Sequence, residues 1–225
     1  MFFALIFGYA LSLVIKEEDH PLLKILTAIF DASLKVIEGA MKMAPYAIFS
    51  IIFNTTYNLG AGFLANVAQF VGVVILGLLI QFFVVYGTAL KVIAKISPLK
   101  FFAACKELYI YAFSTASSNA TLPVALETAE KVLHLPPRIS RFVLTIGASA
   151  NQNGTALFEG VVVLFLAQVY GINLSFENQV LVVLMSVLAG VGTAGVPGGS
   201  LPLIVILLTQ VGIPAEGIGL VLGVD

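Results

Sequence analysis

Long apolar segments separated by short polar breaks dominate the chain. Residues 43–90 and 178–215 contain no charged side chain. Because a membrane-spanning helix needs about 20 residues, each stretch can hold at least one crossing. The hydrophobic period predicts helices at residues 1–15, 22–53 and 62–96. Between them we expect a charged connector at residues 16–21, a kink at Pro45 and a polar turn at residues 54–60.

Three further apolar segments are interrupted by polar or glycine-rich residues. Within the membrane, backbone can leave the helix only where its polar groups find partners or line a polar cavity. The arms on either side of the first and last breaks are too short to span a bilayer. The segments at residues 98–133, 139–170 and 177–211 have their predicted breaks at residues 114–121, 147–155 and 190–200.

The basic residues surround only the first interrupted segment. Positive residues gather in cytoplasmic loops, so both ends of this segment are expected on the cytoplasmic side. No Lys or Arg follows Arg141, so both ends of the last interrupted segment are expected outside. Two interrupted segments of opposite orientation indicate an inverted-repeat transporter with its site near the middle of the membrane. The basic residues are Lys91, Lys95, Lys100 and Lys106 before the first break, and Lys131, Arg138 and Arg141 after it.

Composition supports an integral membrane protein. The chain is 60% hydrophobic and 10% charged, whereas soluble domains carry roughly 25% charged residues. The net charge of −1 without a basic run argues against nucleic-acid binding. A single cysteine, Cys105, excludes a disulfide framework. His20 and His134 are far apart in sequence, which argues against a histidine-based metal site.

Three motifs resemble those of the glutamate transporter family, the dicarboxylate/amino acid:cation symporters. They occur in the family's order, and each lies on one of the interrupted segments. Residues 117–123 read Ser-Ser-Asn-Ala-Thr-Leu-Pro, residues 151–155 read Asn-Gln-Asn-Gly-Thr, and residues 192–198 read Gly-Thr-Ala-Gly-Val-Pro-Gly.

The resemblance implies an all-α membrane protein with a glutamate-transporter-like fold. This fold has two oppositely oriented re-entrant hairpins and a broken transmembrane helix. Residues 1–96 would supply scaffold and transport-domain helices, and residues 97–225 the transport-domain core. Compared with the family, we expect the first three helices, most of the fourth and nearly all of the last to be missing. The last helix would start at residue 217, with Asp225 as its first acidic residue.

The resemblance also implies roles for individual residues. One sodium ion would be held by Gly147 and Asn151, and another by backbone carbonyls. A third sodium site is expected to be weakened, because Asn153 replaces the family's aspartate and removes a negative charge; Gln152 replaces its methionine. The carbonyl ligands would belong to Ser149, Gly190, Val191 and Thr193. The substrate-binding residues would be Ser117, Ser118, Asn119, Thr155, Gly195, Val196 and Pro197, the last three forming an extracellular gate.

Glu159 is the one carboxylate within the segment at residues 139–170. An ionisable residue inside the membrane is a functional candidate by default, and family members with a glutamate at the matching place use it to carry a proton. Glu159 is therefore a candidate for proton coupling. The alternative is a protonated glutamic acid that is hydrogen-bonded inside the helix bundle.

Together these features predict a multi-pass protein of the cell membrane, a homotrimer when full length. It would take up a small anionic or amino-acid substrate with sodium ions, protons or both, by elevator-type alternating access and without a further cofactor. Ala116 stands where some family members have a substrate-binding arginine, so the substrate stays undetermined. The alternatives are a non-transporting fragment and an uncoupled, anion-permeable channel. An enzyme is disfavoured, because Ser117 and Ser118 have no His or Lys near them in sequence.

Overall fold

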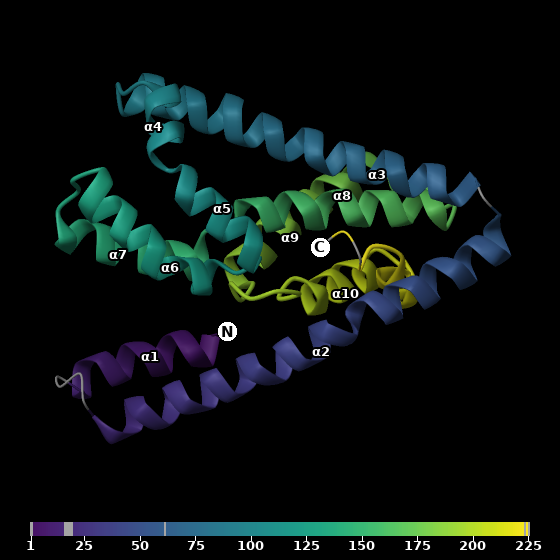
Figure 1. The fold of residues 1–225 in the computed structure, drawn as a ribbon. Coiled ribbons are helices and arrows are strands. Elements are labelled where there is room, and N and C mark those ends of the chain that lie inside the picture. The colour runs from purple at the N-terminus through teal and green to yellow at the C-terminus, as the bar shows by residue number, and fades with distance from the viewer. Residues whose placement is uncertain (1, 16–19, 61, 223, 225) are drawn as a thin grey trace. The chain divides into compact units, whose positions relative to one another are not determined.

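The computed structural model describes residues 2–15, 20–60, 62–222 and 224, and every element among them is helical (Figure 1). This agrees with the predicted all-α class. The chain divides into two compact units, residues 1–45 and 46–225. Two helical stretches of the described residues, Leu64–Ile93 and Pro137–Val169, are long and apolar enough to cross a bilayer.

The first unit contains α1 (Phe2–Val14) and most of α2 (Pro21–Leu59). His20 caps α2: its backbone carbonyl accepts from the Leu23 N–H at 3.0 Å, and its Nδ1 accepts from the Leu22 N–H at 3.2 Å. Pro21 occupies the first turn, where its missing N–H is not needed. Of the predicted connector, residues 16–19 lie outside the described residues. The boundary between the units follows Pro45, inside α2; the kink stays a prediction.

The polar turn predicted at residues 54–60 is wrong. The helix α2 continues through these residues to Leu59. Gly60 ends it with a left-handed backbone (φ 83°), and its N–H donates to the Thr56 carbonyl at 2.9 Å. A glycine in this conformation is a common helix end, so the helix ends at one glycine and not in a seven-residue turn.

The second unit continues with one long apolar helix, as predicted for residues 62–96. It comprises α3 (Gly62–Leu79) and two π-helical stretches, η1 (Ile80–Tyr86) and η2 (Ala89–Ile93). Lys95 then leaves the helix with φ 57°. The π-helical stretches were not expected from the sequence. They often mark functional sites.

The first helical hairpin has a much shorter break than predicted. Only Ala116 and Ser117 lie between α5 and α6, because Ala116 adopts the left-handed conformation (φ 45°) and Ser117 caps the next helix. Pro123 lies inside α6 and does not start it. The elements are α4 (Pro98–Ala104), α5 (Lys106–Thr115), α6 (Ser118–Glu127) and η3 (Thr128–Val132).

The remaining elements also keep more helix than expected. Between α7 and α8 only Asn151 and Gln152 are non-helical, so the nine-residue break predicted at residues 147–155 is wrong. The second helical hairpin, α9 and α10, has its break at residues 193–200. The elements are α7 (Pro137–Ala150), α8 (Asn153–Val169), α9 (Phe176–Gly192), α10 (Leu201–Gln210) and η4 (Ala215–Leu220).

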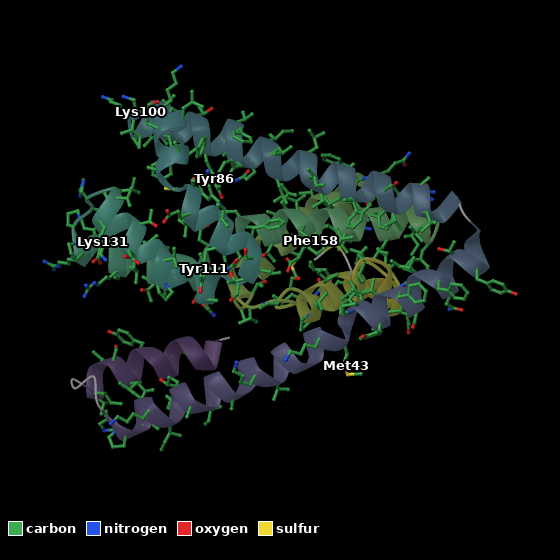
Figure 2. The ribbon with its side chains drawn as sticks, viewed as in Figure 1. Met43, Tyr86, Lys100, Tyr111, Lys131 and Phe158 are labelled. Atoms are coloured by element: carbon green, nitrogen blue, oxygen red, sulfur yellow. The ribbon has the colours of Figure 1, made fainter. Side chains whose placement is uncertain are left out.

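The helix α8 is the centre of the core and packs against α3, α9 and α10. Its residues Val162, Val163 and Leu166 are fully buried. On the α3 side, the ring of Phe70 lies 6.2 Å from that of Phe158, which Figure 2 labels on α8. A packed α8 fixes its own first turn, and that turn borders the candidate site.

Candidate functional site

The tip of the first hairpin is built around Ser117. Its backbone is extended (φ −142°, ψ 117°), and its Oγ accepts from the Ala120 N–H at 3.2 Å, which makes it the N-cap of α6. The same hydroxyl donates to the Gly195 carbonyl at 2.7 Å. One side chain therefore both fixes the turn and joins it to the second hairpin.

Gly195 holds the two hairpin tips in direct contact. Its carbonyl oxygen accepts a second hydrogen bond, from the Asn119 N–H at 3.0 Å. A Cβ at this position would lie 2.7 Å from the Ala148 carbonyl oxygen and 2.9 Å from the Ser118 Cβ. These distances are too short for any side chain, so the contact requires glycine.

Gln152 connects the first hairpin to the break between α7 and α8. Its Nε2 donates to the Ala148 carbonyl at 2.7 Å and lies 3.3 Å from the Ser118 Oγ. The sequence singled out Gln152 only as a departure from a motif and gave it no role. Its position inside the break was the available signal, because a polar side chain there must find a partner.

The end of α9 reaches the same break. A Cβ on Gly190 would lie 3.0 Å from the Ala156 Cβ and 3.1 Å from the Gln152 carbonyl oxygen. The last four carbonyls of a helix lack intrahelical partners, and in α9 these include Gly190 and Val191. Thr193 follows in an extended conformation, and its Oγ1 donates to the Ala189 carbonyl at 3.0 Å.

Four helix ends therefore meet around these contacts. The N-termini of α6 and α8 carry partial positive charge, and the C-termini of α7 and α9 carry partial negative charge. An anionic group is favoured at the first pair of ends, and a cation at the second. No group of three or more His, Cys, Asp or Glu side chains lies together among the described residues. A hard cation here would depend on backbone, amide and hydroxyl oxygens.

The other predicted residues lie along the same segments. Thr155 is half-buried in the first turn of α8, and Glu159, one turn later, is completely buried. Val196 and Pro197 are half-buried in the second tip, where the Val196 N–H donates to the Ala194 carbonyl at 2.8 Å. The last turn of α7 contains Gly147 and Ser149, and the Asn151 N–H donates to the Gly147 carbonyl at 3.0 Å.

Asn153 has a partner that sequence reasoning missed. Its Nδ2 donates to the Tyr86 hydroxyl at 3.1 Å. Tyr86 is the last residue of η1, the π-helical stretch that follows α3 (Figure 2). The two residues are 67 positions apart, so no local pattern could have paired them. The bond uses an amide donor that an aspartate at this position would lack.

The chain matches the sodium:dicarboxylate symporter family over residues 1–225. It is similar to the proton/sodium-glutamate symport protein of Bacillus subtilis (strain 168), with 37% identity over 223 residues that cover 99% of this chain and 51% of that protein. It is 34% identical to the proton/glutamate-aspartate symporter of Escherichia coli (strain K12) over 225 residues, 100% of this chain and 51% of that protein. It is also 32% identical to mouse excitatory amino acid transporter 3 over 224 residues, 99% of this chain and 43% of that protein. The chain thus spans about half the length of the curated relatives it matches.

Proposed function

Because this chain belongs to the sodium:dicarboxylate symporter family, we propose that it carries the site of a secondary active transporter. Its substrate would be an acidic or neutral amino acid or a dicarboxylate, taken up with sodium ions, protons or both. The family consists of membrane symporters and not of enzymes. The observation that supports the proposal best is the meeting of two hairpin tips on the Gly195 carbonyl, beside an interrupted helix.

In this proposal the substrate binds where the four helix ends meet. Its carboxylate faces the N-termini of α6 and α8, next to Ser118, Asn119 and Thr155. Opening of the second tip at Gly195–Pro197 would admit the substrate, and Ser117 would release its bond to Gly195 in that step. Sodium ions would be held at the C-terminal ends of α7 and α9. The ligands at the end of α7 would be Gly147, Ser149 and Asn151, and those at the end of α9 would be Gly190, Val191 and Thr193.

The membrane arrangement belongs to the same proposal. The first hairpin, about residues 98–133, and the second, residues 177–211, would re-enter a multi-pass cell-membrane protein from opposite sides, and α7 and α8 would form a broken transmembrane helix. Residues 97–225 would move as the transport-domain core against scaffold helices from residues 1–96, in an elevator-type motion within a homotrimer.

Two side chains would set the cation coupling. Asn153 contributes a neutral amide whose nitrogen is engaged by Tyr86, so a third sodium ion would bind weakly or not at all. Glu159 is a buried ionisable group one turn from Thr155 and would carry a proton. A measured coupling of three sodium ions per substrate would contradict the first assignment.

Uptake into proteoliposomes under imposed gradients tests the function. Radiolabelled glutamate, aspartate, serine and succinate would be offered with an inward sodium gradient, an inward proton gradient, both or neither. We expect at least one substrate to accumulate only when a gradient is present. Anion current without accumulation would favour an uncoupled channel. The absence of both uptake and current would overturn the proposal.

The substitution Glu159→Gln tests proton coupling. If Glu159 carries the proton, the variant should lose most of the stimulation by an inward proton gradient and most of the pH dependence of uptake. Glu177→Gln is the matched control, because Glu177 lies in the exposed first turn of α9. Unchanged pH dependence in Glu159→Gln would leave the carboxyl with a structural role only.

A further inference from the structure

The long apolar helix that begins with α3 ends in a basic turn. Residues 91–106 contain four lysines and no Asp or Glu. The candidate membrane span Leu64–Ile93 ends within this stretch, and the chain then turns through residues 94–97 into α4, where Figure 2 labels Lys100. The headgroup layer borders the hydrocarbon core of a bilayer. Side chains of residues 91–100, named here the basic elbow, are therefore expected at the depth of the lipid phosphates.

The three lysines of the basic elbow, Lys91, Lys95 and Lys100, are exposed. No ion pair or side-chain hydrogen bond joins them to another residue that the structure describes. Lys131 on the other arm of the first hairpin, by contrast, pairs with Glu127 at 2.7 Å. The elbow thus has positive charge that no acidic side chain of the described residues balances.

Helix electrostatics explains only part of this arrangement. Lys91 lies in the last turn of η2, where the partial negative charge of a helix end favours a cation. Lys100 is the third residue of α4, where the partial positive charge of a helix start disfavours one. An anion from outside the chain would stabilise both lysines.

Lys95 occupies a backbone conformation that glycine adopts more easily. Its φ of 57° is left-handed, and residues with this conformation at helix ends are usually glycine or asparagine. A side chain in such a conformation is a reason to look for a function of that side chain. The charge of Lys95 supplies one.

Apolar side chains accompany the lysines. Ile93 is 81% exposed and Leu99 is 80% exposed, which is typical of segments that insert between headgroups and acyl chains. The elbow is also packed from inside, because the ring of Phe102 on α4 stacks on that of Phe82 on η1 with centroids 4.6 Å apart. The elbow therefore combines unpaired cations with an apolar surface on a packed turn.

We propose that the basic elbow binds the phosphate group of an anionic phospholipid through Lys91, Lys95 and Lys100, with Ile93 and Leu99 against the acyl chains. A lipid fits better than a soluble phosphate, because the exposed apolar side chains have no role toward a soluble anion. The lipid belongs to the cytoplasmic leaflet if the first hairpin enters the membrane as proposed above. That orientation rests on the proposed function, whereas binding does not.

Native mass spectrometry of the purified protein tests binding without a transport assay. The protein in detergent is titrated with dioleoyl phosphatidylglycerol and, separately, with dioleoyl phosphatidylcholine, which has the same acyl chains and no net charge. We expect phosphatidylglycerol to bind roughly tenfold more tightly. This preference should decrease at high salt, because salt screens exposed charges.

The substitution Lys95→Gly separates binding from folding. Glycine removes the charge and suits the left-handed backbone, so the melting temperature should be retained or raised. The affinity for phosphatidylglycerol should nevertheless fall roughly fivefold, the contribution of one lysine near an anionic lipid surface. His134→Gly is the matched control, because His134 is exposed and has the same backbone conformation, with φ 55°. It should bind phosphatidylglycerol as the unmodified protein does.

Two further variants separate charge from apolar contact. Replacement of Lys91, Lys95 and Lys100 together by glutamine should abolish the preference between the two lipids. Leu99→Ser should weaken the binding of both lipids and leave the preference in place. Arg138→Gln removes one exposed cation from α7, outside the elbow, and should leave the affinity unchanged. Size-exclusion profiles report on folding, and Lys95→Gly decides the matter if the triple variant does not fold.

Four outcomes would overturn the proposal. The first is equal binding of the two lipids by the unmodified protein. The second is a preference that survives in Lys95→Gly and in the folded triple variant. The third is an equal loss in Lys95→Gly and Arg138→Gln, which would indicate general attraction to a positive surface. The fourth is displacement of the lipid by glycerol 1-phosphate, which would identify a site for a soluble phosphate. A failure of uptake by proteoliposomes would affect only the proposed function.

Discussion

The tips of the two helical hairpins meet at one carbonyl group but are built in opposite ways. The first tip has two residues outside helices and depends on side chains: the Ser117 hydroxyl caps α6 and donates to Gly195. The second tip has eight such residues, 193–200, and depends on backbone. Its Gly195 supplies a carbonyl, and Gly198 supplies a left-handed turn with φ 70°.

This difference indicates which tip is suited to move. The first tip is a two-residue turn fixed by a helix cap. A change of its conformation would break the cap, which contributes about 1 kcal/mol to the stability of the helix, so few alternative conformations are open to it. A longer turn with three glycines has many conformations open to it, since glycine tolerates backbone angles that other residues avoid. We therefore expect the first tip to act as the fixed donor and the second as the movable acceptor.

The largest effect is expected from Gly195→Ala. The added Cβ would lie 2.7 Å from the Ala148 carbonyl oxygen, and overpacking of such a contact costs about 1–3 kcal/mol. Uptake by proteoliposomes should fall roughly 10- to 100-fold. Gly72→Ala is the control, because a Cβ on this α3 residue would have no atom within 4 Å, and it should retain activity. Normal uptake by Gly195→Ala would show that the tips do not close as the structure has them.

A smaller loss is expected from Ser117→Ala, which removes both the cap of α6 and the donor to Gly195. The bond to Gly195 contributes about 1 kcal/mol, so substrate affinity should fall roughly fivefold. The lost cap costs about 1 kcal/mol of α6 stability in addition. Ser117→Thr retains a hydroxyl and should recover most of the lost substrate affinity. Equal affinities in the alanine and threonine variants would argue against the hydroxyl as the joining group.

The substitution Gln152→Leu tests whether the fixed tip depends on the helix break. It keeps much of the side-chain volume and removes the bonds to Ala148 and Ser118. Because one hydrogen bond contributes about 1 kcal/mol, we expect a two- to fivefold loss of substrate affinity, measured by isothermal titration calorimetry. Gln152→Met, the residue of the family motif, distinguishes polarity from shape. An unchanged affinity in both variants would mean that the first tip is fixed by its cap alone.

The smallest effect concerns the base of the first hairpin. Arg141 Nε donates to Glu130 Oε1 at 3.0 Å, and this bond holds the pKa of the Glu130 carboxyl below its ordinary value. A lowered pKa in the folded state gives stability that is present above the unfolded value of about 4.3. That stability is lost as the pH falls through the folded-state pKa.

Glu130→Gln should therefore lower the melting temperature at pH 6 by roughly 1–2 °C, since exposed ion pairs contribute little. At pH 3 the difference from the unmodified protein should shrink. Glu127→Gln is the control, because Glu127 pairs with Lys131 four residues away on the same arm. A difference that stays constant with pH would exclude the charge of Glu130 as the cause.

The place of each interruption could be predicted from the sequence, but its extent could not. Polar residues pointed to all three breaks, yet the structure keeps Ser118–Thr121 and Asn153–Thr155 in helices. A polar side chain can remain in a helix when a partner lies on a neighbouring segment. Asn153, in the first turn of α8, has such a partner in Tyr86, and local periodicity does not reveal it.

The sequence by itself determined the all-helical membrane class, the family and the segments that contain the site. These properties follow from hydrophobic runs, charge distribution and three short motifs, all of which are local in the chain. Only the tertiary structure decided that Gly195 receives both donors of the first tip and that Asn153 pairs with Tyr86. Each of these depends on residues that lie far apart in sequence and meet only after the helices pack.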